Sequence, residues 1–123
     1  MIEIKKNEDI NEIKQLCKIS GIKFNDTTNA ATMMDREERL GFSIFDIVDN
    51  KAILKNLEPT DDYALADGML RSTIHIALQN NCNSVFYSCD NLEILFDRLG
   101  FILDKNLKQL NTDKLFQSCC DCK

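Results

Sequence analysis

Three of the six cysteines lie within the last five residues of the 123-residue chain. Cys119, Cys120 and Cys122 place three thiols in four positions, a spacing that can chelate a soft metal ion. A closed zinc site needs a fourth ligand, and Cys82, Cys89, a water molecule or another chain are candidates for it. The alternatives are a redox-active pair of thiols or a tail without a function of its own. We favour an inert or redox-labile tail over a metal site.

The remaining thiols and the single histidine carry weaker chemical signals. Cys17 falls on the apolar face of an expected helix, where core packing is the usual role of a free cysteine. Cys89 follows a short apolar strand, and no Cys–His–Asn order typical of a thiol hydrolase accompanies it. His75 lies inside a long helical pattern, beside its apolar stripe, and is expected to have a surface or packing role.

Composition limits the class of protein. A chain of this length with 44% hydrophobic residues can build one core without disulfides, so residues 1–117 are expected to form a single domain and residues 118–123 a cysteine-rich tail. The net charge of −5 argues against nucleic acid as a partner, because a phosphate backbone attracts basic surfaces. No apolar run approaches the roughly 20 residues of a membrane span, and no signal peptide is evident. We therefore expect a cytoplasmic protein with mostly reduced thiols and no membrane partner.

Periodicity and turn residues predict the elements that must position any site. Alternating or continuous apolar residues indicate five strands around residues 2–4, 31–34, 40–48, 52–57 and 85–87, and a sixth at 101–103. Helical spacing indicates helices over about 9–20, 61–80 and 91–99. Asn7 or Asp9 can cap the first of them, and Gly21 and Gly100 suit the positions just after the first and the last. Residues 22–30 are polar and are expected to form a loop.

The element order is β-α-β-β-β-α-β-α-β, which indicates an α/β (α+β) fold with a mixed sheet. Asp49-Asn50 fits a two-residue hairpin turn, so the middle strands are expected to be antiparallel. The long helix that follows them is expected to cross over to a parallel neighbour.

Four stretches carry a resemblance to a known family. They are Leu40-Gly41-Phe42-Ser43-Ile44, Ala52-Ile53-Leu54-Lys55-Asn56-Leu57-Glu58-Pro59, Ala66-Asp67-Gly68-Met69-Leu70 and Leu95-Phe96-Asp97-Arg98-Leu99-Gly100-Phe101. With the element order, they resemble the GNAT superfamily of acyl-CoA-dependent N-acetyltransferases over about residues 30–103. The resemblance implies a GNAT-like, mostly antiparallel mixed sheet with helices on both faces. It also implies that the second stretch is the central strand, which splays from its parallel neighbour.

The resemblance implies acetyl-CoA as the cofactor. Asn56 and Leu57 match the strand whose backbone pairs with the pantetheine arm. Ala66, Asp67, Gly68 and Met69 match the start of the helix whose amides hold the pyrophosphate, and small residues there let the backbone approach an anion.

The phosphate motif departs from the family pattern Gln/Arg-x-x-Gly-x-Gly/Ala. Tyr63 stands at its first position, and Asp61, Asp62 and Asp67 add negative charge near the expected phosphate site. The alternative interpretation of this segment is a well-capped core helix without a ligand.

The resemblance also implies catalytic positions. Phe96 stands where the family often has the tyrosine that protonates the leaving thiolate, and Tyr87 is a possible substitute. Glu58 is the first candidate for the general base that deprotonates the attacking amine, and Asp46 is the second. Positioning of the two substrates without a dedicated acid is a further possibility.

These residues predict an acetyl-CoA-binding N-acetyltransferase-like protein that acts on a small-molecule or peptide amine. One alternative is a non-catalytic binding or regulatory module of the same fold, and another is a thiol or metal function of the tail. The polar loop before the second strand leaves little chain for an acceptor pocket, and a partner chain could complete it. Exposed sheet edges make a homodimer an expectation.

Overall fold

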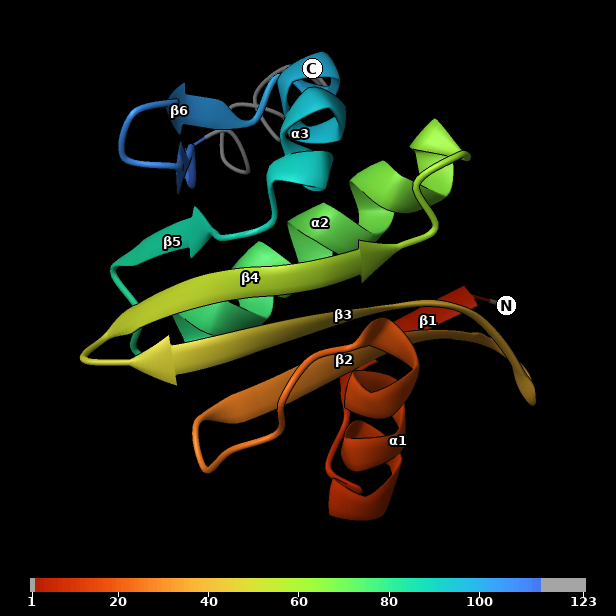
Figure 1. Cartoon of the computed structure of the whole chain (residues 1–123). Helices are drawn as coiled ribbons and strands as arrows, with labels where there is room; N and C mark the ends of the chain where they lie inside the picture. Colours follow the sequence, from red (N-terminus) through yellow and green to blue (C-terminus); the bar gives the residue numbers. More distant parts are fainter. Residues whose placement is uncertain (1, 114–123) are drawn as a thin grey trace.

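The computed structural model describes residues 2–113, which form one seven-stranded mixed sheet with helices on both faces (Figure 1). The strands are β1 (Ile2–Lys6), β2 (Thr28–Asp35), β3 (Glu38–Val48), β4 (Lys51–Glu58), β5 (Ser84–Tyr87), β6 (Ile102–Asp104) and β7 (Gln109–Leu110). The helices are α1 (Ile10–Ser20), α2 (Tyr63–Gln79) and α3 (Glu93–Leu99), with a short 3-10 turn η1 (Asp90–Leu92) before α3. The strand order is β1-β2-β3-β4-β5-β7-β6, and among these described strands only β4 and β5 pair in parallel. The predicted α+β fold with a mixed sheet is confirmed.

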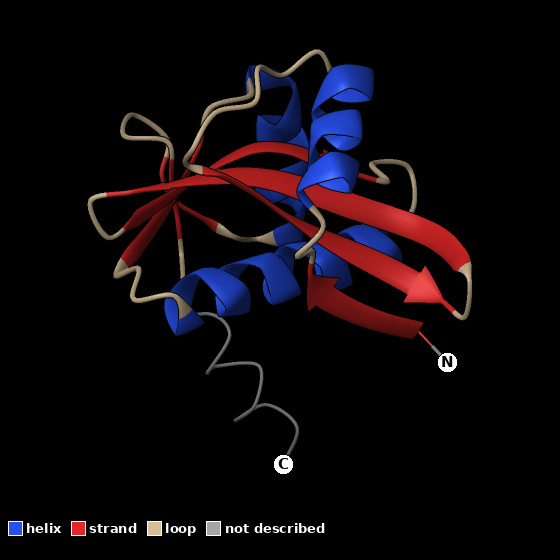
Figure 2. Ribbon diagram, turned by 90° about the horizontal axis from the view of Figure 1, so that it is seen from below, coloured by secondary structure: helices blue, strands red, loops and turns tan. Residues whose placement is uncertain are grey.

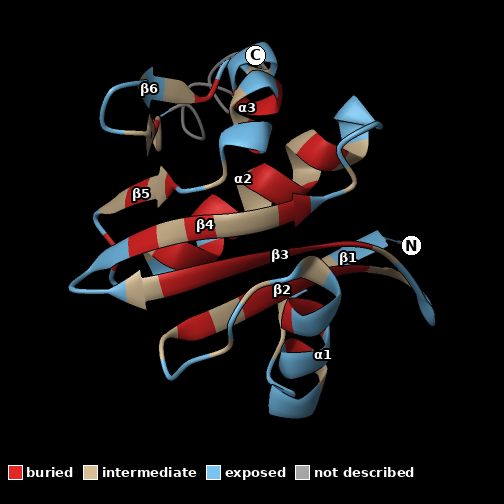
Figure 3. Cartoon of the chain, in the orientation of Figure 1, coloured by how far each residue is buried: buried red, intermediate tan, exposed pale blue. Residues whose placement is uncertain are grey.

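The helices divide between the two faces of the sheet. Ile13, Leu16 and Cys17 of α1 pack with Phe42 and Ile44 of β3 in a small cluster on one face. A larger cluster on the other face joins α2 and α3 to strands β2, β4 and β5. Figure 2 shows helices on both sides of the strands, and Figure 3 shows that the buried residues concentrate along the middle strands. The core placement predicted for Cys17 is confirmed, because its side chain is 1% exposed.

Capping and turn residues place the ends of these elements as predicted. Asp9 caps α1, and Gly21 ends it in a left-handed conformation with φ of 70°. Asp49 and Asn50 have φ of 51° and 64°, so the predicted hairpin turn between β3 and β4 is confirmed. His75 is exposed on α2, in agreement with the expected surface role.

Two details differ from the sequence expectation. Strand β2 begins at Thr28, inside the expected polar loop, because its pairing with β3 extends back to Asp46. Strand β7 was not predicted, since two residues are too short to show a period and gain their order by pairing with β5 and β6. Among residues 2–113, no helix is both long enough and apolar enough to cross a membrane.

Candidate functional site

The parallel strands β4 and β5 separate partway along β4 and form a fork. Their pairing runs from Lys51 and Ser84 to Leu54 and Tyr87, and the Ser88 amide still donates to the Leu54 carbonyl at 3.0 Å. Strand β4 then continues to Glu58 while paired with β3 on its other side. Figure 1 shows β4 running past the end of β5. The last residues of β4 therefore offer a strand edge that β5 does not cover.

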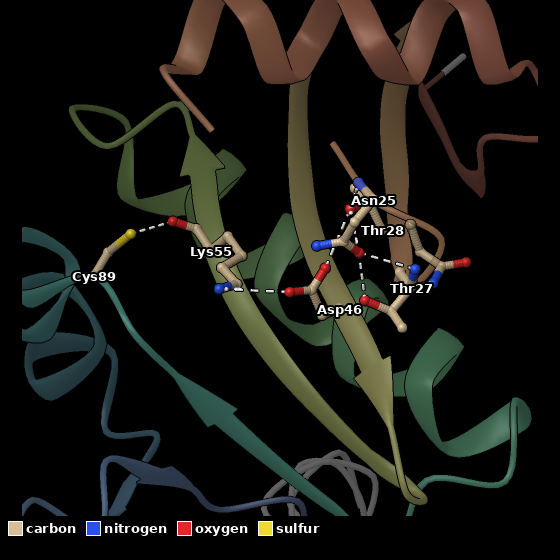
Figure 4. Close-up of polar contacts among 7 residues, drawn as sticks. Asn25, Thr27, Thr28, Asp46, Lys55 and Cys89 are labelled. Carbon is tan, nitrogen blue, oxygen red and sulfur yellow. Dashed lines mark hydrogen bonds and ion pairs between the residues drawn. The ribbon is translucent and has the colours of Figure 1, made fainter. Parts of the chain in front are cut away.

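A β-bulge lies at the point of separation. Asn56 is opposite Ile44 and Leu54 is opposite Phe45, so Lys55 is an extra residue of β4 at this point of the pairing. A bulge bends its strand and increases the local twist, which turns β4 away from β5. The Cys89 thiol donates a hydrogen bond to the Lys55 carbonyl, so Cys89 lies at the base of the fork (Figure 4). Burial raises the pKa of the Cys89 thiol, which keeps the proton that this hydrogen bond needs.

Polar side chains gather on the α1 side of the fork. The Asp46 side chain is only 12% exposed, and its Oδ2 lies 3.4 Å from the Lys55 ammonium. Its Oδ1 accepts a hydrogen bond of 3.3 Å from the Thr28 hydroxyl, which is in turn 3.2 Å from Asn25 Oδ1. Figure 4 shows this group, with Lys55 lying over β4 and Asp46 reaching it from β3. Asp46, the second candidate for the base, is therefore a buried carboxylate with a cation beside it.

Glu58 and Asn56 extend this side of the fork. Asn56 Nδ2 donates to Ser20 Oγ at the end of α1 at 3.0 Å, and to Glu58 Oε2 at 3.4 Å. Glu58 is exposed at the end of β4. An exposed carboxylate beside the uncovered strand edge can accept a proton from an amine, either directly or through water. Leu57 contributes its side chain to the α2 core and its main chain to the same edge.

Tyr87 and Phe96 lie on the other side of the sheet, in the core formed with α2 and α3. Tyr87 is 2% exposed, and its hydroxyl donates to Glu93 Oε2 at 2.6 Å. Its ring meets that of Phe96 edge-to-face at 5.4 Å. Burial first, and then the hydrogen bond and charge of Glu93, raise the pKa of Tyr87 well above its usual value. Phe96 is fully buried, which agrees with its expected packing role.

The raised pKa of Tyr87 predicts a loss of stability at alkaline pH. Above about pH 10 the unfolded chain releases the phenol proton while the folded chain retains it, so the free energy of unfolding falls as pH rises. Urea titrations at pH 8 and pH 11 measure this difference. Tyr87→Phe should be about 1–3 kcal/mol less stable at pH 8, because it loses a hydrogen bond to a carboxylate. The same variant should show a smaller loss between the two pH values, and an equal loss would contradict the assignment.

The amino terminus of α2 lies just after the end of β4. The Asp62 side chain caps the helix by accepting from the Leu65 amide at 3.2 Å, and its carbonyl accepts from the Ala66 amide at 2.8 Å. Of the first amides of the helix, those of Tyr63 and Ala64 are left to bind an anion. Arg98, from the last turn of α3, donates to the Tyr63 hydroxyl and lies over its ring. A cation from a distant part of the chain thus stands beside the first turn of α2.

The four helix residues predicted to hold the pyrophosphate lie just after that first turn. Ala66 and Met69 are fully buried, and Asp67 is paired with Arg71 Nε at 2.8 Å. A Cβ added at Gly68 would face the Ile4 and Met33 side chains at 3.9 Å, on the sheet side of the helix. Their contact with a cofactor stays a prediction.

Sequence reasoning did not single out Lys55 or Arg98 as members of a site. The bulge that turns Lys55 toward Asp46 has no sequence signal, and Arg98 becomes relevant only when α3 packs beside α2. Within residues 2–113, no group of three or more histidine, cysteine, aspartate or glutamate side chains could hold a metal ion. Cys119, Cys120 and Cys122, the candidate metal ligands, lie outside the described residues.

Comparison with known proteins identifies the fold. No family model and no curated protein matches the sequence. A Bacillus subtilis acetyltransferase in complex with CoA matches with a TM-score of 0.60 and 11% identity, over 85% of this chain and 78% of that one. The ribosomal-protein-S18-alanine N-acetyltransferase of Escherichia coli matches with a TM-score of 0.57 and 15% identity, over 89% and 88%. An aminoglycoside acetyltransferase from an uncultured soil metagenomic sample matches with a TM-score of 0.62 and 8% identity, over 85% and 90%. At these identities the likeness establishes the fold.

Proposed function

Because the chain has the fold of the GNAT acetyltransferases, we propose that it binds acetyl-CoA in the β4–β5 fork and transfers the acetyl group to an amine. The observation that carries this proposal is the fork itself. A bulge at Lys55 turns β4 away from β5 and leaves the stretch from Asn56 to Glu58 without a partner strand on the β5 side. An extended thioester arm can bind to such an edge through main-chain hydrogen bonds, as an added strand would.

The residues around the fork fit this ligand. Asn56 and Leu57 lie on the uncovered edge and are the proposed contacts of the pantetheine arm. The Tyr63 and Ala64 amides and the Arg98 guanidinium are the proposed contacts of the phosphates, because free helix amides and arginine both favour an anion. Asp61 and Asp62 oppose phosphate binding, and both are exposed, so salt and water screen their charge. The bound group would supply an acetyl group activated as a thioester.

Glu58 and Tyr87 have separate proposed roles on the two sides of the fork. Glu58 is placed to take the proton of the attacking amine, since it is exposed beside the α1 side of the fork. Tyr87 retains its proton through burial and would have to turn from Glu93 to protonate the leaving thiolate. The acceptor is a small-molecule or peptide amine that reaches the fork from the α1 side.

Calorimetric titration with acetyl-CoA, followed by an assay of acetyl transfer to a panel of amines, tests the proposal. We expect binding by the wild-type protein and by Glu58→Gln alike. Transfer by Glu58→Gln should fall by roughly 10²- to 10⁴-fold, the usual contribution of a general base. Glu38→Gln changes an exposed carboxylate at the first residue of β3 and serves as the matched control. The absence of both heat and thermal stabilisation at millimolar acetyl-CoA would refute the proposal.

A second candidate function is a binding or regulatory module that holds the cofactor without turnover. It is favoured by the environment of the expected acid: Phe96 has no proton to give, and Tyr87 is bonded to Glu93. Binding of acetyl-CoA without transfer to any amine of the panel would support this candidate. A transfer rate that Glu58→Gln abolishes would exclude it.

A further inference from the structure

Lys55, the residue at which β4 leaves β5, carries an amine of the chain itself. Lys55 is the bulge residue, and its carbonyl accepts from the Cys89 thiol at the base of the fork. Its ε-amine lies over β4 on the α1 side, 3.4 Å from Asp46 Oδ2. Figure 4 shows the amine between the strand that carries Asp46 and the segment that carries Cys89. Lys55 and Asp46 therefore place a nucleophile next to a proton acceptor, and Lys55 directly precedes the strand edge proposed to bind the thioester.

Partial burial and an ion pair distinguish Lys55 from a surface lysine. The Lys55 side chain is 35% exposed and its partner carboxylate 12% exposed. Lys51, on the same strand, is exposed and lies over the Phe86 ring instead. A restricted amine close to a reacting carbonyl has a high effective concentration, and a freely moving surface amine does not.

We propose that Lys55 is an acetyl acceptor, so that the chain acetylates itself within the fork. The inference rests on the proposed function, because it requires an acyl thioester bound along the edge of β4. It deepens that function by naming one acceptor, the ε-amine of the strand residue at which the fork opens.

The step balances without a further reactant. Asp46 accepts a proton from the Lys55 ammonium, and the neutral nitrogen attacks the thioester carbonyl carbon. A carbon–nitrogen bond forms, the carbon–sulfur bond breaks, and the nitrogen loses a second proton to solvent. The sulfur leaves with the bonding electron pair and takes up a proton as free CoA thiol. The products are Nε-acetyl-Lys55, CoA and one released proton.

Site-resolved mass spectrometry after incubation with acetyl-CoA tests this inference. We expect Lys55 to be acetylated at least about tenfold faster than Lys51, because Lys55 is the residue at which β4 leaves β5 and Lys51 lies at the closed end of the pairing. The rate at Lys55 should not depend on protein concentration, as expected for a reaction within one chain. Asp46→Asn should slow it, and Lys55→Arg should remove the fast reaction while retaining the positive charge.

A thioester without the nucleotide provides the matched reagent. With the acetyl thioester of N-acetylcysteamine, the order should reverse, since Lys51 is the more exposed amine and nothing then directs the reagent to the fork. A preference for Lys55 with both reagents would overturn the inference, because it would reflect amine reactivity alone.

In the unliganded protein, Lys55→Gln should lower the melting temperature more than Lys51→Gln does, since Asp46 loses its cation. Equal shifts of the melting temperature would show that Lys55 and Asp46 do not form a stabilising ion pair, and would contradict the inference.

Titration separates this inference from the proposed function. If acetyl-CoA binds and Lys55 reacts no faster than Lys51, self-acetylation is refuted and cofactor binding stands. If acetyl-CoA does not bind, the proposed function fails and self-acetylation fails with it.

Discussion

Gly41→Ala is expected to lower the free energy of unfolding by about 1–3 kcal/mol, the usual effect of inserting a methyl group where there is no room. A Cβ at Gly41 would lie 2.5 Å from the Glu58 carbonyl oxygen and 2.9 Å from Pro59 Cδ. These atoms belong to the backbone and to a rigid ring, so relief requires a shift of the end of β4. Urea unfolding monitored by circular dichroism measures the loss.

The same substitution should also weaken acetyl-CoA binding, because the end of β4 forms one side of the fork. Strands β3 and β4 pair at this point through Phe42 and Glu58, and a shift of Glu58 moves the proposed base as well. A variant of unchanged stability and unchanged affinity would show that β4 tolerates the displacement, and would contradict the close approach seen at Gly41.

Gly68→Ala is the matched control. Its Cβ would meet Ile4 and Met33 only at 3.9 Å, an ordinary contact, and glycine inside a helix is less stable than alanine by roughly 0.5–1 kcal/mol. We therefore expect a gain in stability where Gly41→Ala gives a loss.

Local signals predicted most of the fold. The apolar face of α1, the Asp9 cap and the left-handed Gly21 all lie within one helix, so the sequence contains everything that sets them. The turn at Asp49 and Asn50 is likewise set by two residues that tolerate positive φ. The start of β2 and the whole of β7 depend on neighbouring strands far away in the sequence, and no local pattern indicates them.

The candidate site was harder to predict because its chemistry depends on long-range contacts. Glu58 and Tyr87 were predicted from the resemblance, and the structure places their side chains on opposite sides of the sheet. The register shift that turns Lys55 toward Asp46 arises from the pairing of β3 with β4, which periodicity does not describe. Arg98 is an ordinary helix-end cation in the sequence, and only the packing of α3 beside α2 brings it to Tyr63.

The position of Arg98 bears directly on how an acidic chain could hold a phosphate ligand. Asp61 and Asp62 precede α2, and the net charge of the chain is −5, so the general field repels anions. Two free amides supply only partial positive charge. The Arg98 guanidinium beside Tyr63 carries a full positive charge. One of its nitrogens donates to the Tyr63 hydroxyl, and its other N–H groups can donate to a phosphate. Arg98 is therefore expected to decide whether phosphate binding is favourable.

Arg98→Ala is expected to weaken acetyl-CoA binding roughly tenfold, because a hydrogen bond to a charged group contributes about 1.5–3 kcal/mol and 1.4 kcal/mol is one factor of ten. Arg98→Glu should weaken it further, and should reduce the decline of affinity with added salt, since the attraction that salt screens has been removed. Calorimetric titration at low and high salt measures both effects. Lys14→Glu is the control. Lys14 belongs to α1, on the other face of the sheet, and its ammonium lies over the Phe24 ring, so this charge reversal changes the net charge by the same amount. If the two charge reversals weaken binding equally, Arg98 acts only through the general field, and the phosphates bind elsewhere.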